Sequence, residues 1–260
     1  MIPILAHVDY LRRHLTATVE YRPGVKLDIY QPVSQPFIPN RPVMVYAPGG
    51  AWLWGSRKGQ GSALIAHLVE QGWICVAIDY RTAPKNRWPA PFEDVTAAWN
   101  WVRKNISRYG GGDFIGLAGA SAGGHMASLL GVTDHSIDRP DCVIPFYGVY
   151  SWDSHRPDHW LINRFVETVI SSREHLRAAS PIHHVHDSAP PFLIIHGDRD
   201  FVTPASGAKA FHRKLPDSQY HSVRGGHHGF DVINVQQTAG ALARIDTFLE
   251  DQLVDFDVAS

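Results

Sequence analysis

Gly119-Ala120-Ser121-Ala122-Gly123 places one serine between two glycines, each two residues away. An apolar run over residues 114–118 precedes this stretch, and the helix-prone run His125-Met126-Ala127-Ser128-Leu129-Leu130 follows it. This strand–turn–helix order is typical of a nucleophile elbow, which presents the serine hydroxyl at a strained turn. Small neighbours are needed because the sharp turn brings strand and helix close together. The pattern alone also fits an ordinary Gly/Ser turn, so the rest of the chain must decide between the two.

Length and composition describe an ordinary globular protein. The chain has 260 residues, of which 44% are hydrophobic and 19% charged, enough to bury a full core. The formal net charge of -1 gives no reason to expect nucleic acid or an anionic membrane as a partner. No apolar run approaches membrane-spanning length, and the N-terminus is too short and interrupted for a signal-peptide core. We therefore expect a single domain over residues 1–260, cytoplasmic, without stable membrane anchoring, as a monomer or homodimer.

Short apolar runs alternate with helical patterns along most of the chain, which is typical of a parallel sheet covered on both faces. After a hairpin at residues 15–21 and 26–31, the expected strands are residues 43–47, 74–79, 114–118, 142–147, 192–196 and 219–223. The expected helices are residues 60–71, 92–105, 122–131, 204–215 and 235–252. The pattern predicts an α/β protein with a mostly parallel sheet of about eight strands and helices on both faces.

Residues 151–186 interrupt this alternation. They carry aromatic and charged residues without an obvious strand. An insertion of this length between two sheet strands indicates a short helical cap over the active face. A surface excursion without substrate contact is the alternative.

Two further strand ends carry an acid and a base. Asp200 follows the expected strand at residues 192–196, and His228 follows the strand at residues 219–223. The chain order Ser…Asp…His is the order of the α/β-hydrolases. A histidine takes the proton of the serine hydroxyl, and a carboxylate fixes the histidine tautomer. We assign Ser121 as nucleophile, His228 as base and Asp200 as orienting acid, with His227 and Asp198 as the rival base and acid.

The tetrahedral intermediate of acyl transfer needs hydrogen-bond donors for its oxyanion. Pro48-Gly49-Gly50-Ala51-Trp52 follows the strand at residues 43–47, where the second oxyanion loop of an α/β-hydrolase belongs. Glycines let the backbone approach the substrate and point N–H groups toward it. We expect N–H groups of Gly49, Gly50 or Ala51 to act together with that of Ala122.

These segments together resemble the hormone-sensitive-lipase-like branch of the α/β-hydrolases, specifically bacterial carboxylesterases and lipases. The family patterns His-Gly-Gly-Gly/Ala-Trp, Asp-Tyr-Arg-x-Ala-Pro, Gly-Asp-Ser-Ala-Gly-Gly and His-Gly-Phe are matched in order. The matching stretches are Pro48-Gly49-Gly50-Ala51-Trp52, Asp79-Tyr80-Arg81-Thr82-Ala83-Pro84, Gly119-Ala120-Ser121-Ala122-Gly123-Gly124 and His228-Gly229-Phe230. The resemblance implies the α/β-hydrolase fold and a serine hydrolase that needs no cofactor. It would cleave small carboxylic esters, with short- to medium-chain acyl groups, through an acyl-enzyme intermediate.

Two departures loosen this analogy. Pro48 replaces the family histidine that braces the oxyanion loop, and Ala120 replaces the acidic residue beside the nucleophile. Hydrolases of N-formylkynurenine have a similar oxyanion loop, so an arylformamidase that cleaves an amide stays open. A non-catalytic ligand-binding protein of the same fold is a third alternative, which the complete triad disfavours.

Other conspicuous residues are less specific. Trp52, Trp54, Trp152 and Trp160 either line an acyl pocket or pack the cap against the core, since ligand sites are largely apolar and aromatic. The run His183-His184-Val185-His186-Asp187 fits no standard helical ligand pair, so we expect a polar loop and no metal.

Overall fold

The computed structural model describes residues 4–33, 38–133, 139–152, 160–170, 172 and 174–259, apart from the side chains of residues 4, 5, 160–162 and 259. Its centre is an eight-stranded sheet in the order β1-β2-β4-β3-β5-β6-β7-β8. The β1–β2 and β2–β4 pairs are antiparallel, and the other pairs are parallel. The strands are β1 Leu15–Arg22, β2 Val25–Tyr30, β3 Arg41–Ala47, β4 Ile74–Ile78, β5 Gly111–Ala120, β6 Val143–Phe146, β7 Phe192–Gly197 and β8 Ser218–Val223.

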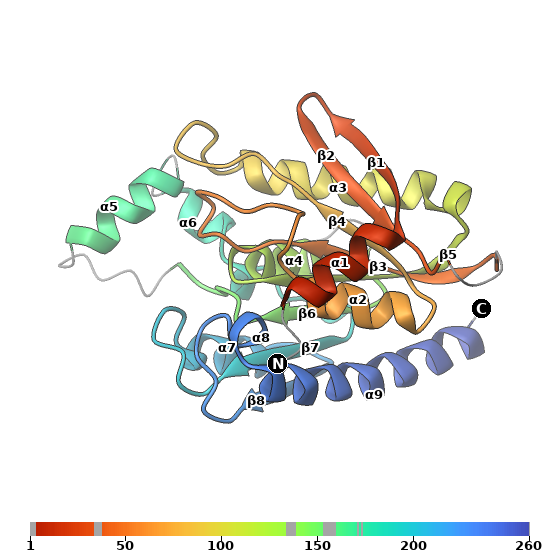
Figure 1. Cartoon of the computed structure of the whole chain (residues 1–260). Coiled ribbons are helices and arrows are strands. Elements are labelled where there is room, and N and C mark those ends of the chain that lie inside the picture. Colours follow the sequence, from red (N-terminus) through yellow and green to blue (C-terminus); the bar gives the residue numbers. More distant parts are fainter. Residues whose placement is uncertain are drawn as a thin grey trace.

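Helices cover both faces of the sheet (Figure 1). Helices α3, α4 and α7 pack on one face, and α1, α2 and α9 on the other. The bounds of these six are α1 Ile4–His14, α2 Ser62–Glu70, α3 Ala90–Asn105, α4 Ala122–Val132, α7 Ala205–His212 and α9 Val235–Ala259. The shorter helical segments are η1 Ile106–Tyr109, α5 Trp160–Val169, α6 His175–Ala178, η2 Pro181–His183 and α8 Phe230–Ile233.

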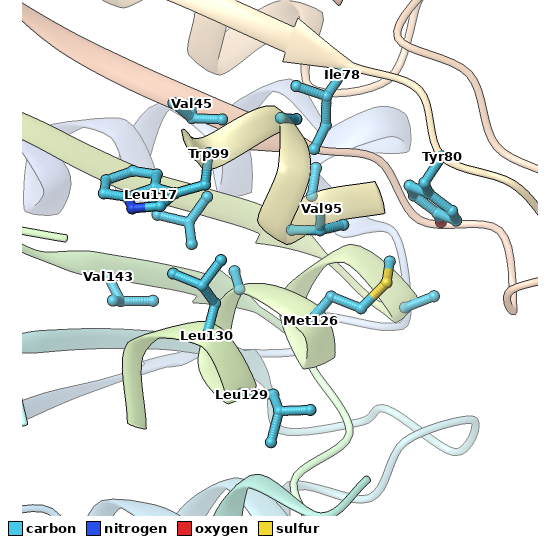
Figure 2. Close-up of a cluster of buried hydrophobic side chains, with 14 of the residues drawn as sticks. Val45, Ile78, Tyr80, Val95, Trp99, Leu117, Met126, Leu129, Leu130 and Val143 are labelled. Carbon is cyan, nitrogen blue, oxygen red and sulfur yellow. The ribbon is translucent and has the colours of Figure 1, made fainter. Parts of the chain in front are cut away.

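The core lies in two layers, one on each face of the sheet. Successive side chains of a strand point to opposite faces, so Val43 and Val45 of β3 join one layer while Met44 and Tyr46 join the other. Figure 2 shows part of the first layer, where strand side chains meet those of α3 and α4. Burial on both faces explains why the parallel strands are continuously apolar in the sequence.

The sequence-based prediction of the fold is confirmed. The sheet has the expected eight strands and both expected helical layers. Cys75 and Cys142 are buried free thiols. Helix α1 was not predicted, because its 11 residues mix six apolar with five polar ones and only a few of them, such as Leu11, are buried. Within the described residues, no helix combines the length and apolarity needed to cross a bilayer.

The parallel strands bring their carboxyl ends to one edge of the sheet. Ser121 directly follows β5, and Tyr147 directly follows β6. The segment after β7 contains Asp200, and the segment after β8 contains His228. This edge is where ligands bind in open α/β sheets.

The predicted cap lies only partly within the described residues. Residues 153–159, 171 and 173 fall outside them, while α5, α6 and η2 cover much of the rest. Helix α5 projects at one end of the molecule (Figure 1). The Trp88 N–H donates to Val169 O at 2.8 Å, and Trp88 forms a β-bridge with Ile170, so the segment is tied to the chain just before α3. A capping role for residues 151–186 stays a prediction.

Candidate active site

Ser121 occupies a strained turn between β5 and α4. Its backbone has φ 54 and ψ -114, outside the usual regions for a residue with a side chain. The two glycines of the stretch are required by space: a Cβ atom on Gly119 would lie 2.6 Å from Gly123 O, and one on Gly123 would lie 2.0 Å from Ala47 O. The close approach of strand and helix that the sequence predicts is therefore present. The elbow also lies in contact with the end of β3.

Ser121, His228 and Asp200 form one hydrogen-bonded chain. His228 Nε2 lies 2.9 Å from Ser121 Oγ, and His228 Nδ1 lies 2.8 Å from Asp200 Oδ2. The Asp200 side chain is fully buried, whereas that of His228 is 22% exposed. With Nδ1–H donating to the carboxylate, the Nε2 lone pair is left to accept the serine proton.

The rival acid and base make other contacts. His227 Nδ1 lies 3.0 Å from Arg199 O. Asp198 Oδ1 accepts a hydrogen bond from the Gly225 N–H at 2.7 Å, which ties the β7 loop to the β8 loop. Both residues therefore brace the loops that carry Asp200 and His228.

Asp200 is held by the loop that follows it. Its Oδ1 accepts the N–H groups of Val202 and Thr203, each at 2.9 Å, and its Oδ2 accepts the Thr203 hydroxyl at 2.9 Å. Burial raises the pKa of the Asp200 carboxyl, but the hydrogen bonds from His228 and Thr203 outweigh this and lower the pKa below its ordinary value. The carboxylate is thus kept charged. Sequence analysis missed Thr203, although a threonine three residues after an aspartate fits a local side-chain turn.

The predicted oxyanion loop, residues 48–52, runs beside Ser121. A Cβ atom on Gly49 would lie 2.8 Å from Ala120 O and 3.2 Å from Ser121 Cβ. Within the described residues, the N–H groups of Gly49, Gly50, Ala51 and Ala122 donate to no protein acceptor. Gly50 has φ +131, a conformation that favours glycine.

Gln60 is a second residue that sequence analysis missed. Its Oε1 lies 3.4 Å from the Cβ position on Gly49, so its amide borders the same space. The sequence predicts Gln60 as the first residue of a helix, whereas α2 begins at Ser62, and a single glutamine there carries no signal that could have found it.

The Asp79-Tyr80-Arg81 segment braces the oxyanion loop. Tyr80 Oη donates to Pro48 O at 2.8 Å, and Asp79 Oδ1 accepts the Arg57 N–H at 2.8 Å. Arg81 is held in turn by Asp94, to which its Nε donates at 2.8 Å. The loop is therefore supported by a hydrogen bond to the Pro48 carbonyl. This support does not need the histidine side chain that proline replaces at position 48.

Trp52, the last residue of the loop, lies in a buried aromatic cluster with Trp152. Their ring centroids are 4.9 Å apart, and Trp52 lies 5.1 Å from the ring of His125. His125 Nε2 donates to Ala179 O at 2.6 Å, and burial lowers the pKa of His125 to about 4. Trp54 is 64% exposed. The Trp160 side chain lies outside the described residues, so substrate contact by these tryptophans stays a prediction.

The His183–Asp187 run makes ordinary loop contacts. His184 Nε2 lies 3.0 Å from Ala178 O, and His186 Nδ1 lies 3.0 Å from Ser188 Oγ. In the part of the chain that the structure describes, no three His, Cys, Asp or Glu side chains gather as a metal site.

This sheet, with a Ser–His–Asp chain at its carboxyl edge in that sequence order, defines the α/β-hydrolase class. The BD-FAE family model matches residues 27–215. The chain belongs to that family. This agrees with the resemblance to hormone-sensitive-lipase-like carboxylesterases drawn from the motifs.

The chain is also similar to proteins that are named as esterases. The chain is 39% identical over 251 residues to Esterase LipC of Mycobacterium tuberculosis, covering 87% of this chain and 62% of the relative. It is 34% identical over 259 residues to Esterase LipQ of the same species, covering 90% and 62%. The chain thus spans about three fifths of the length of these curated relatives. Among solved structures, Thermogutta terrifontis esterase 2 phosphonylated by sarin matches with TM-score 0.77 and 25% identity, covering 90% of this chain and 94% of that one.

Proposed function

We propose that this chain is a serine carboxylesterase acting on small-molecule esters. The observation that carries the proposal is the continuous hydrogen-bonded chain from Ser121 through His228 to Asp200, with the N–H groups of Gly49 and Ala122, which donate to no protein acceptor within the described residues, near Ser121. The similarity to named esterases supports the same activity.

In the first half-reaction the Ser121 hydroxyl attacks the ester carbonyl carbon while His228 Nε2 takes the hydroxyl proton. Asp200 holds the tautomer that allows this and stabilises the imidazolium that forms. The carbonyl oxygen becomes an oxyanion and accepts hydrogen bonds from the N–H groups of Gly49 and Ala122, with Gly50 or Ala51 as further donors. The C–O bond to the alcohol then breaks, and His228 gives the proton to the leaving alkoxide.

In the second half-reaction water replaces the alcohol. His228 takes a proton from the water as it attacks the acyl carbonyl, and the same donors hold the second oxyanion. The acid leaves, and His228 returns the proton to Ser121 Oγ, which restores the resting site.

The acyl chain is expected to be short to medium. Gln60 and the tryptophan cluster are the groups near the oxyanion loop that would limit it. An amide hydrolase of the arylformamidase kind gains no support from the named esterases. A cytoplasmic location and a monomeric or homodimeric state also stay predictions from the sequence.

The test is a rate comparison on the purified chain. It would use p-nitrophenyl esters from acetate to laurate, an aryl formamide, and Ser121→Ala as the control. We expect hydrolysis of the acetate or butyrate ester that disappears in Ser121→Ala. Faster turnover of the formamide would replace the esterase proposal with the amidase alternative, and ester hydrolysis retained by Ser121→Ala would refute the assigned nucleophile.

A further inference from the structure

A second hydrogen-bonded pair, Tyr147 and Asp231, lies beside the Ser121–His228–Asp200 chain. Tyr147 directly follows β6, which lies between the strand that leads to Ser121 and the strand that leads to Asp200. Asp231 is the second residue of α8, three positions after His228. Tyr147 Oη donates to Asp231 Oδ1 at 2.5 Å. Neither residue takes part in the mechanism described above.

The Tyr147 ring packs against the ring of His228. Their centroids are 4.6 Å apart and their planes are inclined by 60°. Behind it, Tyr147 meets the fully buried Phe230 edge-on at 5.7 Å. The Tyr147 ring therefore packs against one side of the His228 imidazole, and Phe230 supports the Tyr147 ring in turn.

The backbone of Tyr147 is fixed as well. Its N–H donates to Ile195 O at 2.8 Å, and its carbonyl lies 3.1 Å from the Thr203 hydroxyl that also reaches Asp200. Its φ is 37, an uncommon conformation for an aromatic residue. Such strain persists where surrounding contacts determine it, and it gathers at functional sites.

The charges around His228 give the pair an electrostatic role. The titratable groups that face His228 are Asp200 and His196 from the β7 segment, Tyr147 from the end of β6, and Asp231 from α8. Burial raises the pKa of Asp231, while the hydrogen bond from Tyr147 and the charge of His228 oppose that rise. The pKa of Asp231 remains raised on balance, and in its ionised form Asp231 is a second carboxylate whose charge favours the imidazolium.

We propose that Tyr147 and Asp231 are positioning residues for the base. Asp231 fixes the phenol through its hydroxyl, the phenol ring keeps the His228 imidazole aligned between Asp200 and Ser121, and the Asp231 charge adds to the stabilisation of the imidazolium. The inference rests on the proposed function, because it assigns a task to residues that support the proposed base.

The test uses Tyr147→Phe, which keeps the ring but removes the hydrogen bond, Asp231→Asn, which removes the charge, and the double variant. Tyr150→Phe is the matched control, because Tyr150 is also a buried tyrosine stacked on another ring, that of Phe211. The readouts are kcat, KM, the pH profile of kcat/KM, and the pKa of His228 followed by NMR of histidine-labelled protein.

We expect each single variant to lower kcat about 10-fold or more with KM little changed, because a misplaced catalytic group costs rate rather than binding. The pKa of His228 should fall in Asp231→Asn, since loss of a nearby negative charge disfavours the imidazolium, and should move less in Tyr147→Phe, which removes a hydrogen bond but no charge. The double variant should cost about as much as one single variant, because the two residues act as a unit. Tyr150→Phe should keep the wild-type kcat and His228 pKa.

Variants that melt earlier but keep the wild-type His228 pKa and kcat would overturn the inference, because that result describes a purely structural pair. The NMR readout does not depend on turnover. If the wild type hydrolyses no ester, the proposed function fails, while the His228 pKa in the variants still decides whether the pair acts on this histidine.

Discussion

Replacing Gly49 by alanine tests the oxyanion loop through a single methyl group. The added Cβ would lie 2.8 Å from Ala120 O, whereas ordinary contacts begin at 3.4 Å, so loop and elbow must separate by about 0.6 Å. Both partners are backbone, and Ala120 adjoins Ser121, so relaxation must disturb the donor, the nucleophile or both. Loss of one oxyanion donor costs about 2.7–4 kcal/mol of transition-state stabilisation, or about 10²–10³ in kcat.

The assay is the initial rate of p-nitrophenyl acetate hydrolysis, with a thermal melt of each protein. Gly49→Ala should lower kcat at least about 100-fold with KM nearly unchanged. Gly207→Ala is the matched control, because a Cβ atom there meets nothing within 4 Å and the residue lies in α7. It should keep full activity and gain about 0.5–1 kcal/mol of stability. A kcat for Gly49→Ala within threefold of the wild type would refute the role of this loop.

Three other predictions concern the acid, the elbow and the buried histidine. Asp200→Asn should lower kcat on the order of 10⁴-fold at neutral pH by favouring the wrong His228 tautomer, and a loss below tenfold in steady-state kinetics would contradict this. Gly123→Ala, whose Cβ would meet Ala47 O at 2.0 Å, should cost at least about 1–3 kcal/mol in urea unfolding, and an unchanged midpoint would count against the tight elbow. His125 has a folded-state pKa of about 4 against an ordinary value of 6.5, so the unfolded chain binds more protons than the folded chain between these pH values. The free energy of unfolding therefore decreases as pH falls through this window, by up to about 3 kcal/mol. His125→Gln, which keeps a donor for Ala179 O, should lose that acid sensitivity in melts from pH 7 to pH 4, and an unchanged pH dependence would show that other groups cause it.

The parts of the molecule that the sequence predicts are those with local signals. Buried parallel strands are continuously apolar, and the elbow needs glycine on both sides of the serine, so both leave a pattern within ten residues. The acid and base could be placed because strand ends meet at one edge of the sheet. The sequence also favours His228 over its neighbour His227, and the contacts agree, since His228 Nε2 lies 2.9 Å from Ser121 Oγ while His227 Nδ1 lies 3.0 Å from Arg199 O.

The parts that could not be predicted depend on contacts between distant segments. Tyr147 and Asp231 are 84 positions apart and carry no motif. The sequence around Trp52 and Trp152 would look the same whether these side chains line a pocket or pack against each other, as they do here. Helix α1 lies on α2 through a few side chains such as Leu11, which is too weak a pattern to separate it from a loop.

The most direct test of the central claim is covalent labelling of the serine. The wild-type chain would be treated with a fluorophosphonate, its intact mass measured and the modified peptide sequenced, with Ser121→Ala, verified as folded, treated in parallel. One phosphonyl group on Ser121 and none on the variant is the result that the triad predicts. A folded wild type that takes up no label, or a label that persists in Ser121→Ala, would contradict it.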